Sequence, residues 1–405
     1  MTSLKEYNRR RVAAIVFLCM IFEGGGTVLI SAAKAPLMQM YGMDIGQYSM
    51  LLTVRSIVCG VMPIFCGGLS DKIGRKKTII LGMLLFTVFY MTIPQVPKYQ
   101  VLMIAIIILG IGYSLVDPSS QAILFDAYDH PGYLMQFVQV SFAAGGVIVP
   151  FIVSSVVKNG ITWKSSFWIW LVFALFILVY TSLQRFPGLS ADSEEKAALM
   201  EHAFRVEPKA SREGLLICIF VVLNNIVNSA VLNYADLYQQ TVFGLGSSDA
   251  IKVLSYYQLG CVLGALVSAK LVTRYRASVM MVAETAFACA ALFAAIISGS
   301  NTMFTVAVIC VGLGTGVQFS LAVSIAGELF WRYSGAATGA VSSSSAVGIA
   351  LASIIGGIVI PKLGISSYYK IALTAAVLEL VFAVIVNIRY NAVAGPVKRQ
   401  EKNSI

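Results

Sequence analysis

Long apolar runs separated by short polar breaks follow one another along almost the whole chain. A run of roughly 20 apolar residues is long enough to cross a bilayer as an α-helix. Interior prolines such as Pro63, Pro118 and Pro150 are compatible with such helices, because neighbouring helices can satisfy the freed backbone groups. The pattern predicts an all-α polytopic membrane protein with twelve transmembrane helices. They are expected near residues 11–33, 46–67, 77–96, 100–125, 132–157, 164–185, 214–240, 249–271, 277–298, 302–326, 334–360 and 367–390.

The longest polar insert, from Pro187 to Glu213, divides these runs six and six. It is rich in both signs of charge, and its piece from Ala191 to Phe204 is expected to form a surface helix. The first apolar run is too long for a signal peptide and has no small-residue cleavage site after it, so it counts as a span. The predicted units are an N-terminal six-helix bundle (1–186), a cytoplasmic linker (187–213), a C-terminal six-helix bundle (214–391) and a cytoplasmic tail (392–405).

Composition and charge placement support a membrane protein and exclude other classes. Only 12% of the residues are charged, against about a quarter in a soluble protein. One set of alternate loops carries roughly three times as many Lys and Arg as the other, which places both termini in the cytoplasm. The net charge of +10 is thus explained by topology and not by nucleic acid. Short outer loops without a glycosylation sequon suit the inner (cell) membrane of a bacterium.

The chain carries no sign of an enzyme. Its seven cysteines lie in apolar runs without a CxxC pair, and two histidines are too few for a metal cluster. The HExxH, GxSxG and Walker patterns are absent. We therefore expect neither catalysis, nor a metal or other cofactor, nor ATP as the energy source.

The two halves resemble each other at an offset of about 202 residues. Gly110-Ile111-Gly112 matches Gly312-Leu313-Gly314, and Cys59, Asp126 and Gly146 match Cys261, Glu328 and Gly348. An even six-plus-six repeat keeps both halves in the same orientation. Parallel halves related by an axis along the membrane normal are an established transporter plan.

The segment between the second and third runs identifies a family resemblance. It is Gly67-Gly68-Leu69-Ser70-Asp71-Lys72-Ile73-Gly74-Arg75-Lys76-Lys77. This segment resembles the signature loop of the major facilitator superfamily (MFS) at every position, and a degraded copy spans Ser268 to Arg276. The resemblance implies the family's fold of two pseudo-symmetric bundles. It also implies a cytoplasmic gate motif, carried here by Gly67, Asp71, Gly74 and Arg75.

Polar groups inside the apolar runs are the candidate functional residues, since ionisable groups in a bilayer usually face a cavity or a partner. Glu23 precedes three glycines in the first run and Arg55 lies within the second. Asp117 lies in the fourth, with Tyr113 and Gln121 four residues to either side and on the same face. The seventh run carries a polar stripe that we expect on one side of the helix. It comprises Asn225, Asn228, Ser229, Asp236, Gln239 and Gln240.

In the resembled fold, helices 1, 4, 7 and 10 line a central cavity, with 2, 5, 8 and 11 beside them. The resemblance therefore implies proton coupling at Glu23 and Asp117, since sugar–proton symporters of the fucose type also carry a carboxylate in helices one and four. A carboxyl group in a low-dielectric cavity can take up a proton on one side and release it on the other. The implied substrate-binding residues are Arg55, Tyr113, Gln121, Gln139, Asn225, Asn228, Tyr257 and Gln318.

Structural roles remain open for each of these groups. Glu23 or Asp117 can instead be a static ion-pair partner of Arg55, and Arg55 can equally anchor an anionic substrate. The Asn and Gln stripe can join helices rather than bind ligand. Glu284 and Glu379 lie in runs that the resembled fold uses as outer scaffold, so a structural role is favoured for both.

These observations predict a secondary active transporter that moves a small polar solute, a sugar or organic acid, by alternating access with proton symport. Its expected partners are the solute, protons and the lipid bilayer, and it is expected to be a monomer. The alternative is a drug–proton antiporter of the same fold. The fifth run, Gly145 to Pro150, departs from the antiporter pattern by having Val149 where a glycine is usual. A non-transporting sensor would bind ligand without net flux.

Overall fold

The structure is a computed structural model that describes residues 8–96, 98–127, 132–186, 207–272, 274–330 and 334–393. The first half comprises α1 (Arg9–Ala32), α2 (Lys34–Tyr41), α3 (Ile45–Ile73), α4 (Arg75–Thr92), α5 (Tyr99–Ala127), α6 (Gly132–Lys158) and α7 (Lys164–Leu183). The second half comprises the π-helical turn η1 (Ala210–Gly214), α9 (Leu215–Phe243), α10 (Ser247–Ala250), α11 (Lys252–Leu271), α12 (Ala277–Ile296), α13 (Asn301–Thr315), α14 (Gln318–Leu329), α15 (Ser334–Leu363) and α16 (Ile365–Val393).

The predicted twelve spans are confirmed within the described ranges, with α13 and α14 forming one span in two pieces. Eleven segments of the described residues are long and apolar enough to cross a membrane, and α4, whose 18 residues begin with three basic ones, stands at the place of the remaining predicted span. The span predicted near 302–326 is confirmed as Asn301–Leu329, and a turn at Gly316 and Val317 divides its helix in two. A β-carbon on Gly316 at this break would lie 2.7 Å from that of Cys261, so α11 packs directly onto it.

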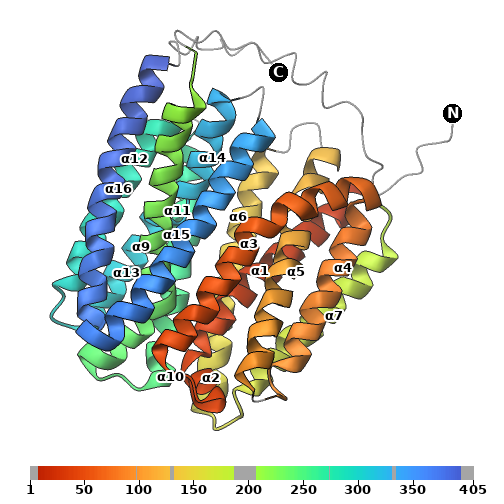
Figure 1. Cartoon of the computed structure of the whole chain (residues 1–405), viewed down its shortest axis with the longest axis vertical. Helices are drawn as coiled ribbons and strands as arrows, with labels where there is room; N and C mark the ends of the chain where they lie inside the picture. Colours follow the sequence, from red (N-terminus) through yellow and green to blue (C-terminus); the bar gives the residue numbers. More distant parts are fainter. Residues whose placement is uncertain are drawn as a thin grey trace.

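Two further differences concern the ends of the spans. The short helices α2 and α10 were not predicted, and both lie at the end of the molecule opposite the start of α1 and the end of α16 (Figure 1). The segment resembling the signature loop is mostly helical, since α3 continues to Ile73 and only Gly74 interrupts the helices. The surface helix expected over 191–204 lies outside the described residues, as does most of the linker.

The helices form two bundles side by side (Figure 1). In the first, α1 packs against α5, α6 and α7, and α4 packs against α5 and α7. In the second, α9 packs against α15 and α16, and α12 packs against α13 and α16. The bundles meet through two pairs of helices, α3 with α15 and α6 with α11. These pairs occupy equivalent places in the two halves, as the 202-residue repeat predicts.

Two glycines allow α1 and α6 to approach closely. A β-carbon added to Gly24 would lie 1.8 Å from the carbonyl oxygen of Phe142, and one on Gly145 would lie 1.9 Å from that of Ile21. Neither position therefore has room for a side chain. Small residues are the usual means of close helix contact in membranes, where lipid gives little hydrophobic drive for association.

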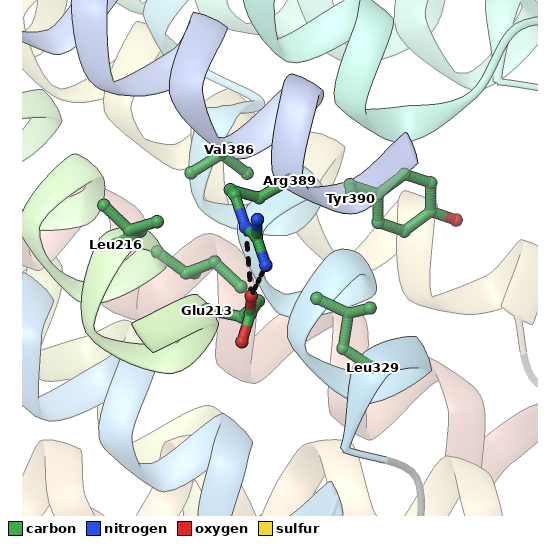
Figure 2. Close-up of a pocket in the computed structure, with 7 residues that line it drawn as sticks. Glu213, Leu216, Leu329, Val386, Arg389 and Tyr390 are labelled. Atoms are coloured by element: carbon green, nitrogen blue, oxygen red, sulfur yellow. Dashed lines mark hydrogen bonds and ion pairs between the residues drawn. The ribbon is translucent and has the colours of Figure 1, made fainter. Parts of the chain in front are cut away.

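An ion pair with a buried carboxylate joins the start of the second bundle to its last helix. Figure 2 shows Arg389 of α16 extending to Glu213, with Leu216, Leu329 and Val386 around them. The Glu213 side chain is 2% exposed, and its Oε1 accepts from Nη2 of Arg389 at 2.9 Å and from Nε of Arg212 at 2.7 Å. Its Oε2 accepts from the backbone N–H of Lys209 at 2.9 Å. These bonds fix the point where the linker meets the bundle.

Candidate functional site

Glu23 lies inside the first bundle, in the middle of α1, and is 1% exposed. Its Oε1 atom makes no hydrogen bond to any residue that the structure describes. Burying a carboxyl group with an unsatisfied oxygen costs much less free energy when the group carries its proton. The position therefore suits a proton-binding carboxyl better than a permanently charged one.

A chain of polar contacts leads from Glu23 across three helices. The Tyr113 hydroxyl of α5 donates to the Glu23 carbonyl oxygen at 2.9 Å, and the Thr27 hydroxyl donates to the Tyr113 oxygen at 3.2 Å. Nη2 of Arg55, from α3, donates to Thr27 Oγ1 at 2.8 Å. The Arg55 guanidinium also lies over the Tyr113 ring, 4.9 Å from its centroid, which is a cation–π contact.

Arg55 is not in an ion pair with either candidate carboxylate. The ion pairs formed among the described residues involve other groups, so the static pairing of Arg55 with Glu23 or Asp117 is wrong. Arg55 is instead linked through Thr27 and Tyr113 to the backbone carbonyl of Glu23. Arg55 is half-buried and makes one hydrogen bond to a described residue. An arginine has five N–H donors, so most of its donors are available to water or to a solute oxygen.

Asp117 is half-buried in α5, one turn from Tyr113. Its Oδ1 accepts from Nε2 of Gln121 at 2.7 Å, one further turn along the same helix. Tyr113, Asp117 and Gln121 therefore share a face of α5, as their spacing predicts. The first bundle thus brings Glu23, Arg55, Tyr113, Asp117 and Gln121 into one polar cluster.

The candidates in α6 and α9 lie in different surroundings. Gln139 of α6 and Asn228 of α9 are half-buried, and neither makes a hydrogen bond to a described residue, so both are open to a solute or water. Asn225 is 8% exposed and donates to the Val221 carbonyl of its own helix at 2.9 Å. A β-carbon on Gly348 of α15 would lie 2.8 Å from that of Asn225, so Asn225 sits against α15.

Tyr257 and Gln318 are buried between helices of the second bundle. The Tyr257 and Thr315 hydroxyl oxygens are 2.9 Å apart, which joins α11 to the end of α13. Nε2 of Gln318 donates to the carbonyl oxygens of Gly314 at 3.0 Å and Met281 at 3.4 Å, towards α12. Both side chains are at most 1% exposed. Their contacts are those of residues that join helices, because each polar head is directed at a neighbouring helix.

The polar residues predicted on one side of α9 lie along an unbroken helix, so their spacing keeps them on that side, but they contact different neighbours. Asp236 faces Lys34 of the first bundle, and Nε2 of Gln239 donates to Asn301 Oδ1 at 2.7 Å and Thr305 Oγ1 at 3.0 Å of α13. Asn225 faces α15. The residues of the stripe therefore contact three different neighbouring helices, α2, α13 and α15.

The gate motif lies at the end of α3 nearest the termini. Gly74 has φ +91°, a backbone conformation that glycine adopts readily, and it separates α3 from α4. Nη1 of Arg75 donates to Ser70 Oγ at 3.1 Å, and Ser119 of α5 donates to the same oxygen at 2.9 Å. Gly67 is part of α3, while the side chain of Asp71 lies outside the described residues.

One polar contact was missed by the sequence reasoning. Lys34 lies in the break between the first two predicted spans, yet it is 3% exposed and its Nζ lies 2.6 Å from Asp236 Oδ1. The 202-residue offset could have indicated this contact, because Lys34 and Asp236 are equivalent positions with opposite charge. A second buried carboxyl, Glu379 of α16, accepts from Nδ2 of Asn224 at 3.0 Å inside the second bundle.

Comparison with known proteins identifies the family to which the chain belongs. The sequence profile of the Major Facilitator Superfamily matches residues 16–274 and 247–404, so the chain belongs to this family of membrane transporters. A solved D-xylose-proton symporter has the same fold. Its TM-score is 0.75 at 16% identity, over 92% of this chain and 97% of the symporter.

Curated relatives are also transporters. The chain is 22% identical to the uncharacterized MFS-type transporter YfkL of Bacillus subtilis over 81% of its length and 84% of that protein. It is 22% identical to the inner membrane transport protein YdiN of Escherichia coli over 96% of its length and 93% of that protein. A shorter match, 22% identical over 41% of this chain and 34% of the relative, is to a lincomycin resistance protein of Streptomyces lincolnensis.

Proposed function

We propose that this transporter carries a small polar solute, a sugar or an organic acid, together with protons. The observation that carries the proposal is Glu23, a carboxyl buried in the first bundle with an unsatisfied oxygen. Arg55 retains N–H donors for a solute oxygen, and Thr27 and Tyr113 link it to the backbone carbonyl of Glu23. The D-xylose-proton symporter of the same fold supports this substrate class and coupling ion.

In this proposal, Arg55, Tyr113, Gln121, Gln139 and Asn228 bind the solute, and Glu23 and Asp117 exchange the proton. Tyr257, Gln318 and Asn225 instead hold the second bundle together, since each is engaged by a neighbouring helix or by its own backbone.

Both termini lie in the cytoplasm of a bacterial cell with the protein in the inner membrane. The end of the molecule with α2 and α10 is then the outer face.

The halves are proposed to rock against each other along α3, α15, α6 and α11, which exposes the solute site to each side in turn. The hydrogen bonds between described residues of the two halves support a state closed at the outer face. They run from Ser31, Lys34, Ser49 and Ser154 near that face inward to Ser255 and, at mid-membrane, Ser343.

The test is uptake into vesicles containing the purified protein, with the pH gradient imposed in either direction. A thermal-shift screen of sugars, organic acids and drugs first identifies a solute that stabilises the protein. We expect inward proton flow to drive accumulation of that solute. Glu23→Gln and Asp117→Asn should abolish accumulation against a gradient while leaving exchange of solute for solute.

Glu379→Gln is the matched control, since Glu379 is equally buried but lies inside the second bundle against Asn224. It should retain proton-driven uptake. Accumulation that continues unchanged in both the Glu23 and Asp117 variants would refute the assignment of the proton site.

Drug–proton antiport is the second candidate, and the match to a lincomycin resistance protein favours it. It predicts stabilisation by drugs rather than by sugars or organic acids. In the same vesicles, the imposed gradient would then drive the compound in the direction opposite to the protons.

A further inference from the structure

A cluster of polar contacts joins the two bundles at the outer face, where α1 ends and α2 begins. Lys34 Nζ donates to Asp236 Oδ1 at 2.6 Å and to the Asn233 carbonyl oxygen at 2.9 Å, while Ser31 Oγ donates to Asn233 Oδ1 at 2.7 Å. The Lys34 ammonium also lies 5.4 Å from the centroid of the Tyr234 ring. All of these bonds cross from the first bundle to the second.

The positions in this cluster are related by the internal repeat. Ser31 and Asn233 are 202 residues apart, and so are Lys34 and Asp236. Each residue therefore bonds to its own equivalent in the other half, which places both pairs on the pseudo-twofold axis between the bundles. Identical residues at such a position would face their own copies, and two lysines or two aspartates would repel each other. The attraction exists because the halves carry opposite charges at equivalent positions.

The ion pair is fully enclosed, with the Lys34 and Asp236 side chains only 4% and 3% exposed. A buried ion pair adds little net stability, because the loss of hydration offsets much of the attraction between the charges. Because the net free energy of the closed pair is small, separating the two charges costs little when both are rehydrated together. Removing one partner is different, since it leaves the other charge buried and unpaired.

We propose that Lys34 and Asp236 are the gate residues of the outer face, an ion pair on the pseudo-twofold axis that must break before solute can enter from outside. The inference rests on the alternating access proposed above, and it names the contact that holds the present state closed. When the bundles part at this end, the two charges separate into water, and when they close, the charges fix the register of α1 against α9.

The symmetry of the pair gives an unusual test. Lys34→Asp puts two carboxylates at the axis, and Asp236→Lys puts two ammonium groups there, so each single reversal should favour opening. The exchanged variant, carrying both Lys34→Asp and Asp236→Lys, restores an opposite pair, and the pseudo-twofold axis gives the exchanged side chains the same relative placement.

Opening can be measured without knowing the solute. Thr53 is 4% exposed in α3, one helical turn deeper than Ser49, whose hydroxyl oxygen lies 2.7 Å from that of Tyr234 in the second bundle. A Thr53→Cys reporter can be labelled with a membrane-impermeant maleimide added outside intact cells. Asn159→Cys, on an exposed outer loop, is the matched reporter that should label equally in every variant. The parent protein with its seven native cysteines gives the background.

We expect each single reversal to raise the labelling rate of Thr53→Cys by about tenfold or more, because unpaired or repelling buried charges shift the population towards the open state. The exchanged variant should return to within about twofold of the parent, a recovery of the kind that double-mutant coupling predicts. If a reversal does not reach the membrane, Lys34→Gln and Asp236→Asn serve in its place, with a smaller increase expected.

Unchanged labelling in the single variants would overturn the proposal, even if their melting temperatures fell, since that outcome describes a purely structural contact. Labelling of the exchanged variant as fast as that of the singles would also overturn it. Neither result depends on proton coupling at Glu23, which is judged by uptake alone, so failure of the gate and failure of the proposed symport are separate outcomes.

Discussion

Alanine at Gly24 or Gly145 should destabilise the first bundle and disturb the polar cluster beside it. The added β-carbons would lie 1.8 Å and 1.9 Å from carbonyl oxygens of the facing helix, about 1.5 Å short of ordinary contact at 3.4 Å. Backbone atoms cannot turn aside as a flexible side chain can, so α1 and α6 must separate. Overpacking of this kind costs about 1–3 kcal/mol.

The two substitutions act on the same contact between α1 and α6. Once the helices have separated to admit one methyl group, the second finds part of its space already made. The double variant should therefore be less destabilised than the sum of the singles, by at least about 0.5 kcal/mol. Because Glu23 directly precedes Gly24, the same displacement should also weaken transport more than the loss of stability alone explains.

The assay is thermal unfolding of the purified protein in detergent, with uptake in vesicles measured in parallel. Each single variant should lower the melting temperature by about 1–4 °C. Gly299→Ala is the matched control, since a β-carbon there meets no atom within 4 Å. Melting temperatures equal to that of the control, or strictly additive losses in the double variant, would refute the reasoning from helix contact.

Two further predictions concern charged groups outside this contact. Arg55→Lys should reduce solute affinity with little change in melting temperature. Lysine keeps the positive charge but lacks the planar guanidinium that lies over the Tyr113 ring. Solute binding as tight as that of the parent protein would contradict this prediction. Glu213→Gln should lower the stability of the second bundle by about 1–3 kcal/mol, since the 2%-exposed carboxylate would no longer pair with Arg389. Asp249→Asn breaks a solvent-exposed ion pair and should leave the melting temperature unchanged. If the Asp249 and Glu213 variants lost the same amount of stability, burial of the carboxylate would not explain the effect at Glu213.

The structure also decides between structural and functional readings of similar residues. Glu23 and Glu379 are both buried carboxyl groups in apolar helices, and the sequence alone does not show which of them has a hydrogen-bond partner. In the structure Glu379 accepts a hydrogen bond from Asn224, while Glu23 keeps an unsatisfied oxygen next to Tyr113 and Arg55. The difference comes from which helices pack alongside, and that is not written in either segment.

The sequence by itself determined that the apolar segments are membrane-spanning helices, because bilayer thickness and backbone hydrogen bonding leave such a segment almost no choice but a helix. It also placed Tyr113, Asp117 and Gln121 on one face, since that depends only on helical periodicity. Only the tertiary structure decided that Arg55 contacts Thr27 rather than a carboxylate, and that Lys34 meets Asp236 on the axis between the halves. Those contacts depend on the height and rotation of packed helices, which side-chain shapes across the whole bundle fix together.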